Sequence, residues 1–201
     1  ISWNLRPPVS EEIDANAIKM GESVVPWQER RKNMKNVCTK CHSENYVNGF
    51  YEQFDSAINL YNGKYGKPAT KIYKMMKSGG VLTATNFDEE LEWTYFYLWH
   101  HEGRRARHGA AMMAPDYTQW HGFFELAERF YMEFVPQVKE ACEKASHVGG
   151  KAADTASLVL KELDVILNKD EHKWFLGKMS VEERSRRKAA AAEFKKRYAQ
   201  N

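Results

Sequence analysis

The chain has 201 residues, which is enough for one sizeable domain or two small ones. Hydrophobic residues make up 43% of it and aromatic residues 13%, which excludes a disordered protein, while the 28% of charged residues indicates a well-solvated surface. The net charge of +3 is too small to indicate a nucleic-acid partner or an anionic membrane, and no apolar run is long enough to predict a transmembrane helix.

The N-terminal part leads from an extended segment into two short helices. Residues 1–10 contain two adjacent prolines and are predicted to be extended. Ser10 and the two glutamates after it predict a helix to about Gly21, because serine caps a first turn and acidic side chains suit its positive end. Pro26 opens a second helix, which is rich in arginine and lysine.

The second helix delivers the sequence CTKCH at residues 38–42, which has the spacing of c-type haem attachment. Cys38 and Cys41 lie on one helical turn, so each thiol can form a thioether with one vinyl group of the same porphyrin, and His42 can then bind the iron as proximal ligand. Half of a zinc site and a thioredoxin-like pair are the alternatives. A zinc site would need a second pair of ligands, and the only other cysteine, Cys142, is isolated; we interpret it as a buried free thiol. A thioredoxin-like pair would need strands nearby, and none are predicted. We therefore predict one covalently bound haem c.

Haem attachment also predicts a compartment. The modification is made on the outer side of an energy-transducing membrane, which indicates the bacterial periplasm or an equivalent internal lumen. A chain that matures there would have lost its export signal, and the start at Ile1 is taken as that of a processed protein or of a piece of a longer one.

After the haem motif, large apolar side chains recur at every third or fourth position, which predicts a long helix. Its buried face is expected to consist of Phe50, Phe54, Ile58, Tyr61 and Tyr65. Residues 66–68 (GKP) are expected to kink or break this helix, which resumes with Ile72, Met75 and Met76 until residues 78–80 (SGG) end it.

Two further long helices follow. Asn86 is expected to cap a helix from about 87 to 113, and Asp116, after Pro115, is expected to cap the next one. This next helix carries an aromatic stripe of Trp120, Phe123, Phe124, Ala127, Phe130, Tyr131 and Phe134. The stripe is wider than one intrachain contact requires, so we expect it to be buried partly between subunits.

The remaining pattern is also helical. Residues 149–150 (GG) are expected to end the aromatic helix, and Leu158, Leu160, Leu163, Ile166 and Leu167 predict an amphipathic helix after it. Ser180 begins a capping box for a last, very basic helix. Because strand-like alternation is nearly absent, the predicted fold class is all-α, with a c-type haem-binding segment followed by a bundle of long helices.

Residues 99–121 hold four of the seven histidines, beside three arginines. His101 and His108 are two helical turns apart on one face, so either could supply the distal ligand of a bis-histidine iron. Arg104 is a candidate for binding haem propionates with its planar guanidinium. A zinc site lacks a carboxylate at a suitable spacing, and each histidine taken singly could be an ordinary residue at the edge of the core.

Three segments carry a resemblance to a known family: residues 38–43 (CTKCHS), 99–107 (WHHEGRRAR) and 114–122 (APDYTQWHG). They closely resemble the C-terminal third of hydroxylamine oxidoreductase, a family of multihaem cytochromes c that includes hydrazine dehydrogenase. The resemblance covers nearly the whole chain, most strongly residues 1–140. It implies a homotrimer in which a tyrosine is covalently linked to a neighbouring subunit's catalytic haem. Tyr117 matches that tyrosine, and Tyr95 and Tyr97 are weaker candidates.

The resemblance also implies an organisation and a function. Residues 1–50 would end a multihaem domain and carry one haem, and residues 51–201 would form the long-helix bundle for oligomerisation. Because only one haem motif is present, the chain is expected to be the C-terminal part of a larger enzyme. That enzyme would oxidise hydroxylamine or hydrazine and pass electrons through c-type haems to a partner such as a small cytochrome c, in the periplasm or the anammoxosome.

Two other functions remain open at this stage. The chain could be a single-haem electron-transfer cytochrome, although its aromatic helices exceed what one haem needs for cover. It could also belong to a reductive multihaem relative that acts on nitrite or hydroxylamine. Such relatives lack the linking tyrosine, so Tyr117 argues against this function by family analogy.

Overall fold

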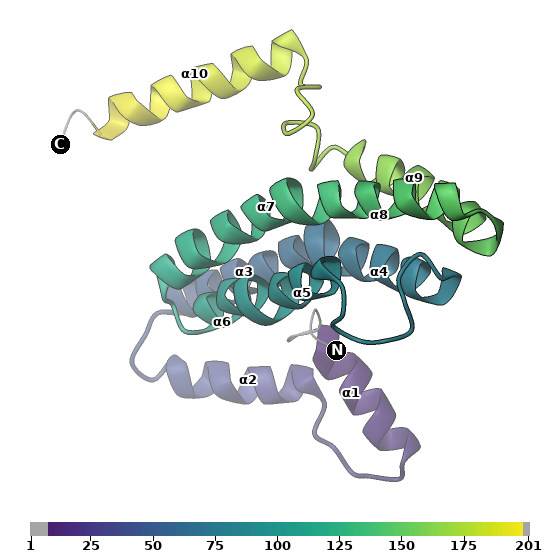
Figure 1. The fold of residues 1–201 in the computed structure, drawn as a ribbon. Helices are drawn as coiled ribbons and strands as arrows, with labels where there is room; N and C mark the ends of the chain where they lie inside the picture. Colours follow the sequence, from purple (N-terminus) through teal and green to yellow (C-terminus); the bar gives the residue numbers. More distant parts are fainter. Residues whose placement is uncertain (1–7, 199–201) are drawn as a thin grey trace. The chain divides into compact units, whose positions relative to one another are not determined.

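The computed structural model describes residues 8–198, and every regular element in that part of the chain is a helix (Figure 1). The predicted all-α fold class is confirmed. The chain divides into two compact units, residues 1–160 and residues 161–201, which are described separately. None of the helices in the described part is long and apolar enough to cross a membrane.

The first unit begins with two short helices. Helix α1 spans Pro8–Lys19 and helix α2 spans Trp27–Cys38. The prediction of an extended segment over residues 1–10 is therefore wrong for its last three residues, because the second proline lies in the first turn of α1, where its missing N–H is not needed; residues 1–7 lie outside the described part. Asp14 holds the two helices together, since it accepts a hydrogen bond from the Trp27 backbone N–H at 2.9 Å and pairs with Arg30 at 3.1 Å.

Three long helical rods follow, and each contains π-helical turns (Figure 1). The first rod consists of α3 (Glu44–Tyr61), η1 (Asn62–Gly66) and α4 (Lys67–Gly79). The second consists of α5 (Glu90–Tyr97), η2 (Leu98–Glu102) and α6 (Gly103–Ala111). The third consists of η3 (Asp116–Phe124), α7 (Glu125–Arg129), η4 (Phe130–Phe134) and α8 (Val135–Val148).

The first rod continues through residues 66–68 instead of breaking there. Pro68 lies in the first turn of α4, and the π turn η1 precedes it, with the Lys67 N–H bonded to the Asn62 carbonyl oxygen. A π turn shifts the hydrogen-bond register by one residue, which accommodates the missing N–H of proline within a continuous helix. The rod ends as predicted, at Gly80, whose φ of +77° favours glycine.

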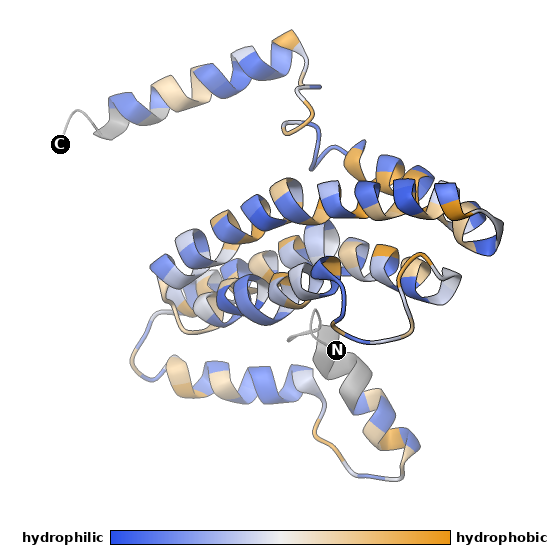
Figure 2. Ribbon diagram, in the orientation of Figure 1, coloured by the Kyte–Doolittle hydropathy of each residue, from blue (hydrophilic) through white to orange (hydrophobic). Residues whose placement is uncertain are grey.

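The core of the first unit lies between the rods. Figure 2 shows hydrophobic and hydrophilic residues alternating along each of them, as amphipathic helices require. The largest fully buried side chains of the first and third rods are Ile58, Tyr61, Ile72 and Met76 on one side and Leu126, Phe130, Phe134 and Val138 on the other. The Tyr65 ring meets Phe130 edge to face, with the ring centroids 5.3 Å apart.

The aromatic stripe therefore divides into two parts. Phe130, Tyr131 and Phe134 are buried within their own chain, which corrects the expectation that this part of the stripe lies between subunits. The reason is that the first rod supplies a full apolar surface opposite them. Trp120 and Phe124 remain exposed and stack on each other, with their rings 4.8 Å apart and nearly parallel.

The second rod begins later than predicted, at Glu90, and ends at Ala111. Asn86 is not its cap, because Phe87 adopts a left-handed φ of 63° and Glu89, which precedes the helix, is extended. The Trp93 indole N–H donates to the Phe87 carbonyl at 3.0 Å and the two rings pack together. This local packing takes Asn86 away from the helix start.

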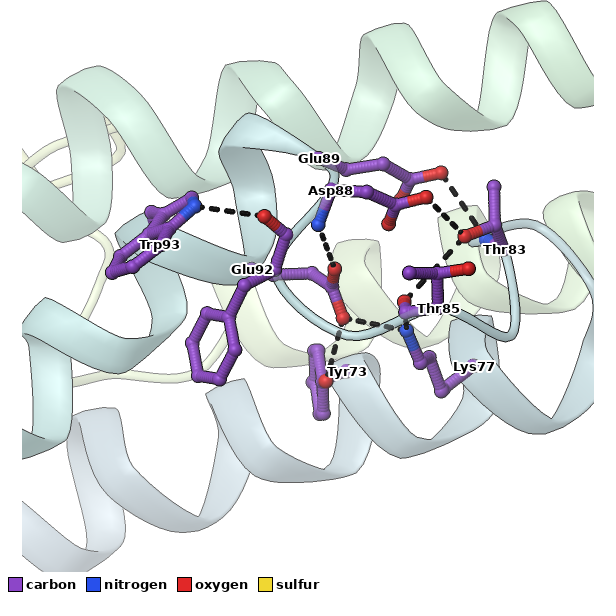
Figure 3. Close-up of polar contacts among 9 residues, drawn as sticks. Tyr73, Lys77, Thr83, Thr85, Asp88, Glu89, Glu92 and Trp93 are labelled. Atoms are coloured by element: carbon purple, nitrogen blue, oxygen red, sulfur yellow. Dashed lines mark hydrogen bonds and ion pairs between the residues drawn. The ribbon is translucent and has the colours of Figure 1, made fainter.

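Glu92 ties the loop before the second rod to the first rod (Figure 3). Its side chain is 2% exposed, pairs with the Lys77 ammonium at 2.6 Å, and accepts hydrogen bonds from the Tyr73 hydroxyl and the Asp88 backbone N–H. Burial, followed by the contact with Glu92, raises the pKa of Tyr73 to about 12. Asp88 and Glu89 approach Glu92 closely enough to suggest a cation site, but the Lys77 ammonium already supplies positive charge there.

The last helices confirm the pattern of the C-terminal sequence. Helix α8 ends at Val148, and Gly149 has a φ of +83°. Helix α9 spans Gly150–Leu167. In the second unit Leu163, Ile166 and Leu167 are buried, and the Ser180 hydroxyl caps α10 (Val181–Tyr198) by accepting from the Glu183 backbone N–H at 3.1 Å. Figure 2 shows that α10 is mostly hydrophilic.

Candidate functional site

The CTKCH motif forms the turn between α2 and α3. Cys38 is the last residue of α2, and its carbonyl oxygen accepts the backbone N–H groups of Cys41 at 3.1 Å and His42 at 3.0 Å. Ser43 caps α3 by accepting from the Tyr46 backbone N–H. Cys38 is partly exposed and Cys41 is exposed, so both thiols are accessible from one tight turn, as the spacing predicts.

His42 leads from this turn to a large groove. Its ring stacks on Tyr46, with centroids 4.9 Å apart, and the Tyr46 hydroxyl contacts Sδ of Met113 at 3.7 Å. Tyr46 and Met113 line a groove of about 1080 Å³ between α3 on one side and α6 with η3 on the other, which we call the α3–α6 groove. His42 thus adjoins this groove through Tyr46, although neither His42 nor the two cysteines belong to its lining.

A second concave site collects most of the other predicted residues. This histidine–arginine pocket has a volume of about 500 Å³. It is lined by His100, His101, Arg104, Arg105, His108, Gly109, Met112, Ala114 and Tyr117. Four residues singled out in the sequence, His101, Arg104, His108 and Tyr117, thus lie around one pocket, and the expectation that His101 and His108 share a helical face is confirmed.

The pocket brings positive charge and aromatic rings together. Burial, followed by the electrostatic effect of the neighbouring His101 and Arg104, lowers the pKa of His100. Burial, then Arg104 and Arg107, likewise lowers the pKa of His108. The rings of His100 and His101 lie 5.3 Å apart, and His100 stacks on Phe96. The lowered pKa values of His100 and His108 favour the neutral imidazole, which is the form that binds a metal.

Tyr117 is placed by close contact between η3 and α6. A Cβ atom at Gly109 would lie 2.8 Å from the Thr118 backbone nitrogen, so only glycine allows the two backbones to approach this closely. Thr118 is buried, and its hydroxyl donates to the Ala114 carbonyl at 2.9 Å. Tyr117, next to this fixed point, is 55% exposed. Its backbone is thus held firmly while its phenol faces outward beside the pocket.

A series of polar contacts links α6 to η3 and to Glu125, the first residue of α7. The His121 ring lies 2.8 Å from a Glu125 carboxylate oxygen through Nδ1 and 3.6 Å from Asp116 through Nε2, and Arg105 pairs with Glu125 at 3.1 Å. Asp116 is therefore not the predicted cap. The helix begins at Asp116 itself, without a side-chain cap, because Pro115 already has helical backbone angles. Its carboxylate instead reaches His121, which lies within one turn of Tyr117 along η3.

Buried charged side chains anchor α6 and the π turn before it to the first and third rods. Arg107 is 2% exposed, lies over the Tyr61 ring at 4.1 Å from its centroid, and donates to the carbonyl oxygens of Gly103 and Trp99. Burial lowers the pKa of this guanidinium, although the contact with Tyr61 opposes the effect. Arg129 of the third rod donates to the buried Glu102 at 3.0 Å. Two of the three arginines in the segment 99–107 thus have structural partners, and Arg104 has no carboxylate partner among the described residues.

The weaker tyrosine candidates lie elsewhere. The Tyr95 hydroxyl shares a hydrogen bond of 2.8 Å with Thr70 and its ring stacks on Tyr73, so it belongs to the packing between the first two rods. Tyr97 contacts His101 edge to face and lies beneath the Arg129 guanidinium. Neither of them lines the histidine–arginine pocket.

The predicted site therefore falls into two parts. Cys38, Cys41 and His42 lie at the turn between α2 and α3, whereas His101, Arg104, His108 and Tyr117 line the histidine–arginine pocket. Sequence reasoning did not single out Met113, which adopts a left-handed φ of 54° and lies in the groove wall; nothing in its sequence context signals that conformation. No family model, no curated protein and no solved structure matches this chain.

Proposed function

We propose that this chain serves in a multihaem cytochrome c oxidoreductase that oxidises a small nitrogen compound, hydroxylamine or hydrazine, and transfers electrons through c-type haems. The observation that carries the proposal is the pocket that His101, Arg104, His108 and Tyr117 line together. The sequence singles out these residues as haem ligands, a propionate partner and a cross-linking phenol, and a shared pocket lets the ligand and the propionate partner serve one haem while Tyr117 lies beside it.

The turn at residues 38–42 fits covalent haem. Both thiols are accessible on one turn, and His42 is anchored directly beside them by the start of α3 and by its stack on Tyr46. In the proposal Cys38 and Cys41 hold the haem through thioethers and His42 is the proximal ligand of its iron. A bound haem would supply one-electron redox chemistry.

In the pocket His108, or alternatively His101, serves as a distal ligand to a low-spin haem, and Arg104 binds a haem propionate. The lowered pKa of His108 favours this role, because a neutral imidazole is the form that binds iron. Replacing His108 with alanine should give a high-spin or water-bound iron at one haem. Unchanged spectra in both His108→Ala and His101→Ala would show that neither histidine is a haem ligand.

Tyr117 is proposed as the residue that links to the catalytic haem of a neighbouring subunit. Its exposed phenol on a firmly held backbone supports this role, since a link between subunits needs an accessible ring whose position is fixed. A macrocycle held out of plane is one of the means by which a protein changes haem reactivity.

The proposal includes partners and a compartment. The protein would act as a homotrimer and would pass electrons to a redox partner such as a small cytochrome c, in the periplasm or the anammoxosome. The stacked and exposed rings of Trp120 and Phe124, on the same helix as Tyr117, offer an apolar surface for contact between subunits.

The deciding experiment replaces Tyr117 with phenylalanine in the full-length protein, with Tyr97→Phe as the matched control. Tyr117→Phe should remove the cross-linked haem peptide from the peptide mass map and most of the oxidation of hydroxylamine or hydrazine, while the haem at His42 remains. Tyr97→Phe should change neither. If Tyr117→Phe oxidises both substrates at the unmodified rate, the oxidative function is wrong; if mass spectrometry finds one haem in the full-length protein, a single-haem electron carrier replaces it.

A further inference from the structure

The histidine–arginine pocket has an unusual balance of polar groups. Its lining contains two arginines, three histidines and a tyrosine hydroxyl, and none of its lining residues is an aspartate or a glutamate. Arginine side chains and the tyrosine hydroxyl offer N–H and O–H donors, so the described wall is rich in donors and contains no carboxylate acceptor. We infer that this pocket binds an oxyanion, either a free inorganic one or the carboxylate of a larger ligand, with Arg104 as the principal residue.

Arg104 is the residue best suited to this role. Arg105 already pairs with Glu125 at 3.1 Å, and Arg107 is buried against Tyr61 and two backbone carbonyls, away from the lining of the pocket. Arg104 is exposed and lines the pocket, and it has no carboxylate partner among the side chains that the structure describes. An accessible, planar guanidinium without a counter-charge can bind carboxylates and other oxyanions through bidentate hydrogen bonds.

The surroundings of Arg104 concentrate its charge. The pocket is concave, and the side chains of Met112 and Ala114 form apolar parts of its wall. An anion next to Arg104 would supply the counter-charge that no carboxylate of the pocket lining supplies.

The volume of the pocket fits a small ligand or part of a larger one. At about 500 Å³ it lies within the range of ordinary ligand pockets and exceeds what a single inorganic oxyanion needs. The occupant is therefore either a free oxyanion accompanied by water or the carboxylate edge of a larger molecule. Only the second of these, a haem propionate, rests on the proposed function; the binding chemistry follows from the pocket's own donors.

Chemical modification tests the inference on the protein as it is isolated. A dicarbonyl reagent specific for arginine is applied with sodium sulfate or with sodium chloride at equal ionic strength, and the modification of each arginine is followed by peptide mass mapping. Arg186, which is exposed on α10, is the matched control. A free-oxyanion site predicts that sulfate slows the modification of Arg104 by roughly tenfold, as a charged hydrogen bond would, and leaves Arg186 unchanged.

A measurement of haem reduction potentials tests whether the bound carboxylate is a haem propionate. If Arg104 binds a haem propionate, Arg104→Gln should lower the reduction potential of one haem, because the loss of a nearby positive charge stabilises its oxidised form, while Arg186→Gln should not. The inference is overturned if sulfate leaves the rate at Arg104 unchanged and no haem potential moves in Arg104→Gln. Sulfate protection in a protein that proves to carry no haem would keep the anion site and remove the proposed function.

Discussion

A Cβ atom added to Gly122 would lie 2.6 Å from Cα of Ala106, so the third rod touches the backbone of the second rod at this point. Gly109 forms the matching contact from α6, against the Thr118 backbone. One contact lies at Tyr117 and Thr118 and the other at Gly122, further along the same helix, and together they fix how η3 lies on α6. A methyl group at either position must push the helices apart, because the atoms it meets are backbone and cannot move aside.

We therefore expect Gly122→Ala to lower the free energy of unfolding by about 1–3 kcal/mol, the usual cost of overpacking. The measurement is urea denaturation followed by circular dichroism. Gly49→Ala in α3 is the control, because nothing lies within 4 Å of its added Cβ. That change should raise stability by about 0.5–1 kcal/mol, since alanine is the better helix former. Equal effects of the two changes would contradict close packing at Gly122.

The glycines of the three rods show which parts of the fold the sequence could predict and which it could not. The first and third rods were predictable because large apolar side chains recur every three or four residues, and Gly80 and Gly149 follow their ends as expected. The meeting of Gly109 with the Thr118 backbone was not, because a glycine required for a close approach between helices looks like any other glycine within one helix.

The π turns mark a second limit. A π turn holds one more residue per hydrogen-bonded turn than an α-helix, and the predicted helices assumed α-helical spacing throughout. The predicted caps at Asn86 and Asp116 were wrong for a related reason, since Phe87 packs on Trp93 and Asp116 reaches His121. Local capping patterns do not include such contacts. The grouping of His101, Arg104 and His108 was predictable because seven residues make two helical turns.

Phe130 tests the corrected position of the aromatic stripe. It is 1% exposed and contacts Tyr65 within the chain, so Phe130→Asp should bury an unpaired charge and lower the free energy of unfolding by several kcal/mol, or prevent folding. Met132→Asp, on the same helix at 67% exposure, should have almost no effect. Denaturation at several protein concentrations separates the two interpretations, because burial between subunits would make the Phe130→Asp effect depend on concentration.

The ion pair between Lys77 and Glu92 provides a test of the loop before α5 (Figure 3). Lys77→Met should lower the free energy of unfolding by about 3–5 kcal/mol, because it leaves the buried Glu92 carboxylate without its cation. Lys144→Met removes the cation of an exposed pair with Glu140 on α8 and should leave stability nearly unchanged. If the two variants unfold at the same denaturant concentration, Glu92 is not a buried anchor of the loop.

The three cysteines should differ in reactivity because they lie in different surroundings. Alkylation requires the thiolate, and burial raises the pKa of Cys142 to about 11, so this thiol should stay unmodified in the native protein at pH 8. It is fully buried in α8 and should react only after denaturation. Cys38 and Cys41 are accessible, so a preparation made without haem attachment should be alkylated at both positions in its native state.

The fully processed protein gives the decisive comparison. A thioether sulfur cannot be alkylated as a thiol, so after denaturation with a reductant only Cys142 should gain the label. Cys38 and Cys41 should then be recovered by mass mapping as a single peptide that retains the mass of a haem. The double variant Cys38→Ala/Cys41→Ala should lose that mass and still label at Cys142, because the α8 thiol is independent of the turn after α2. Three labelled cysteines in the denatured, fully processed protein would exclude covalent haem at this motif, and with it the electron-transfer role proposed for His42.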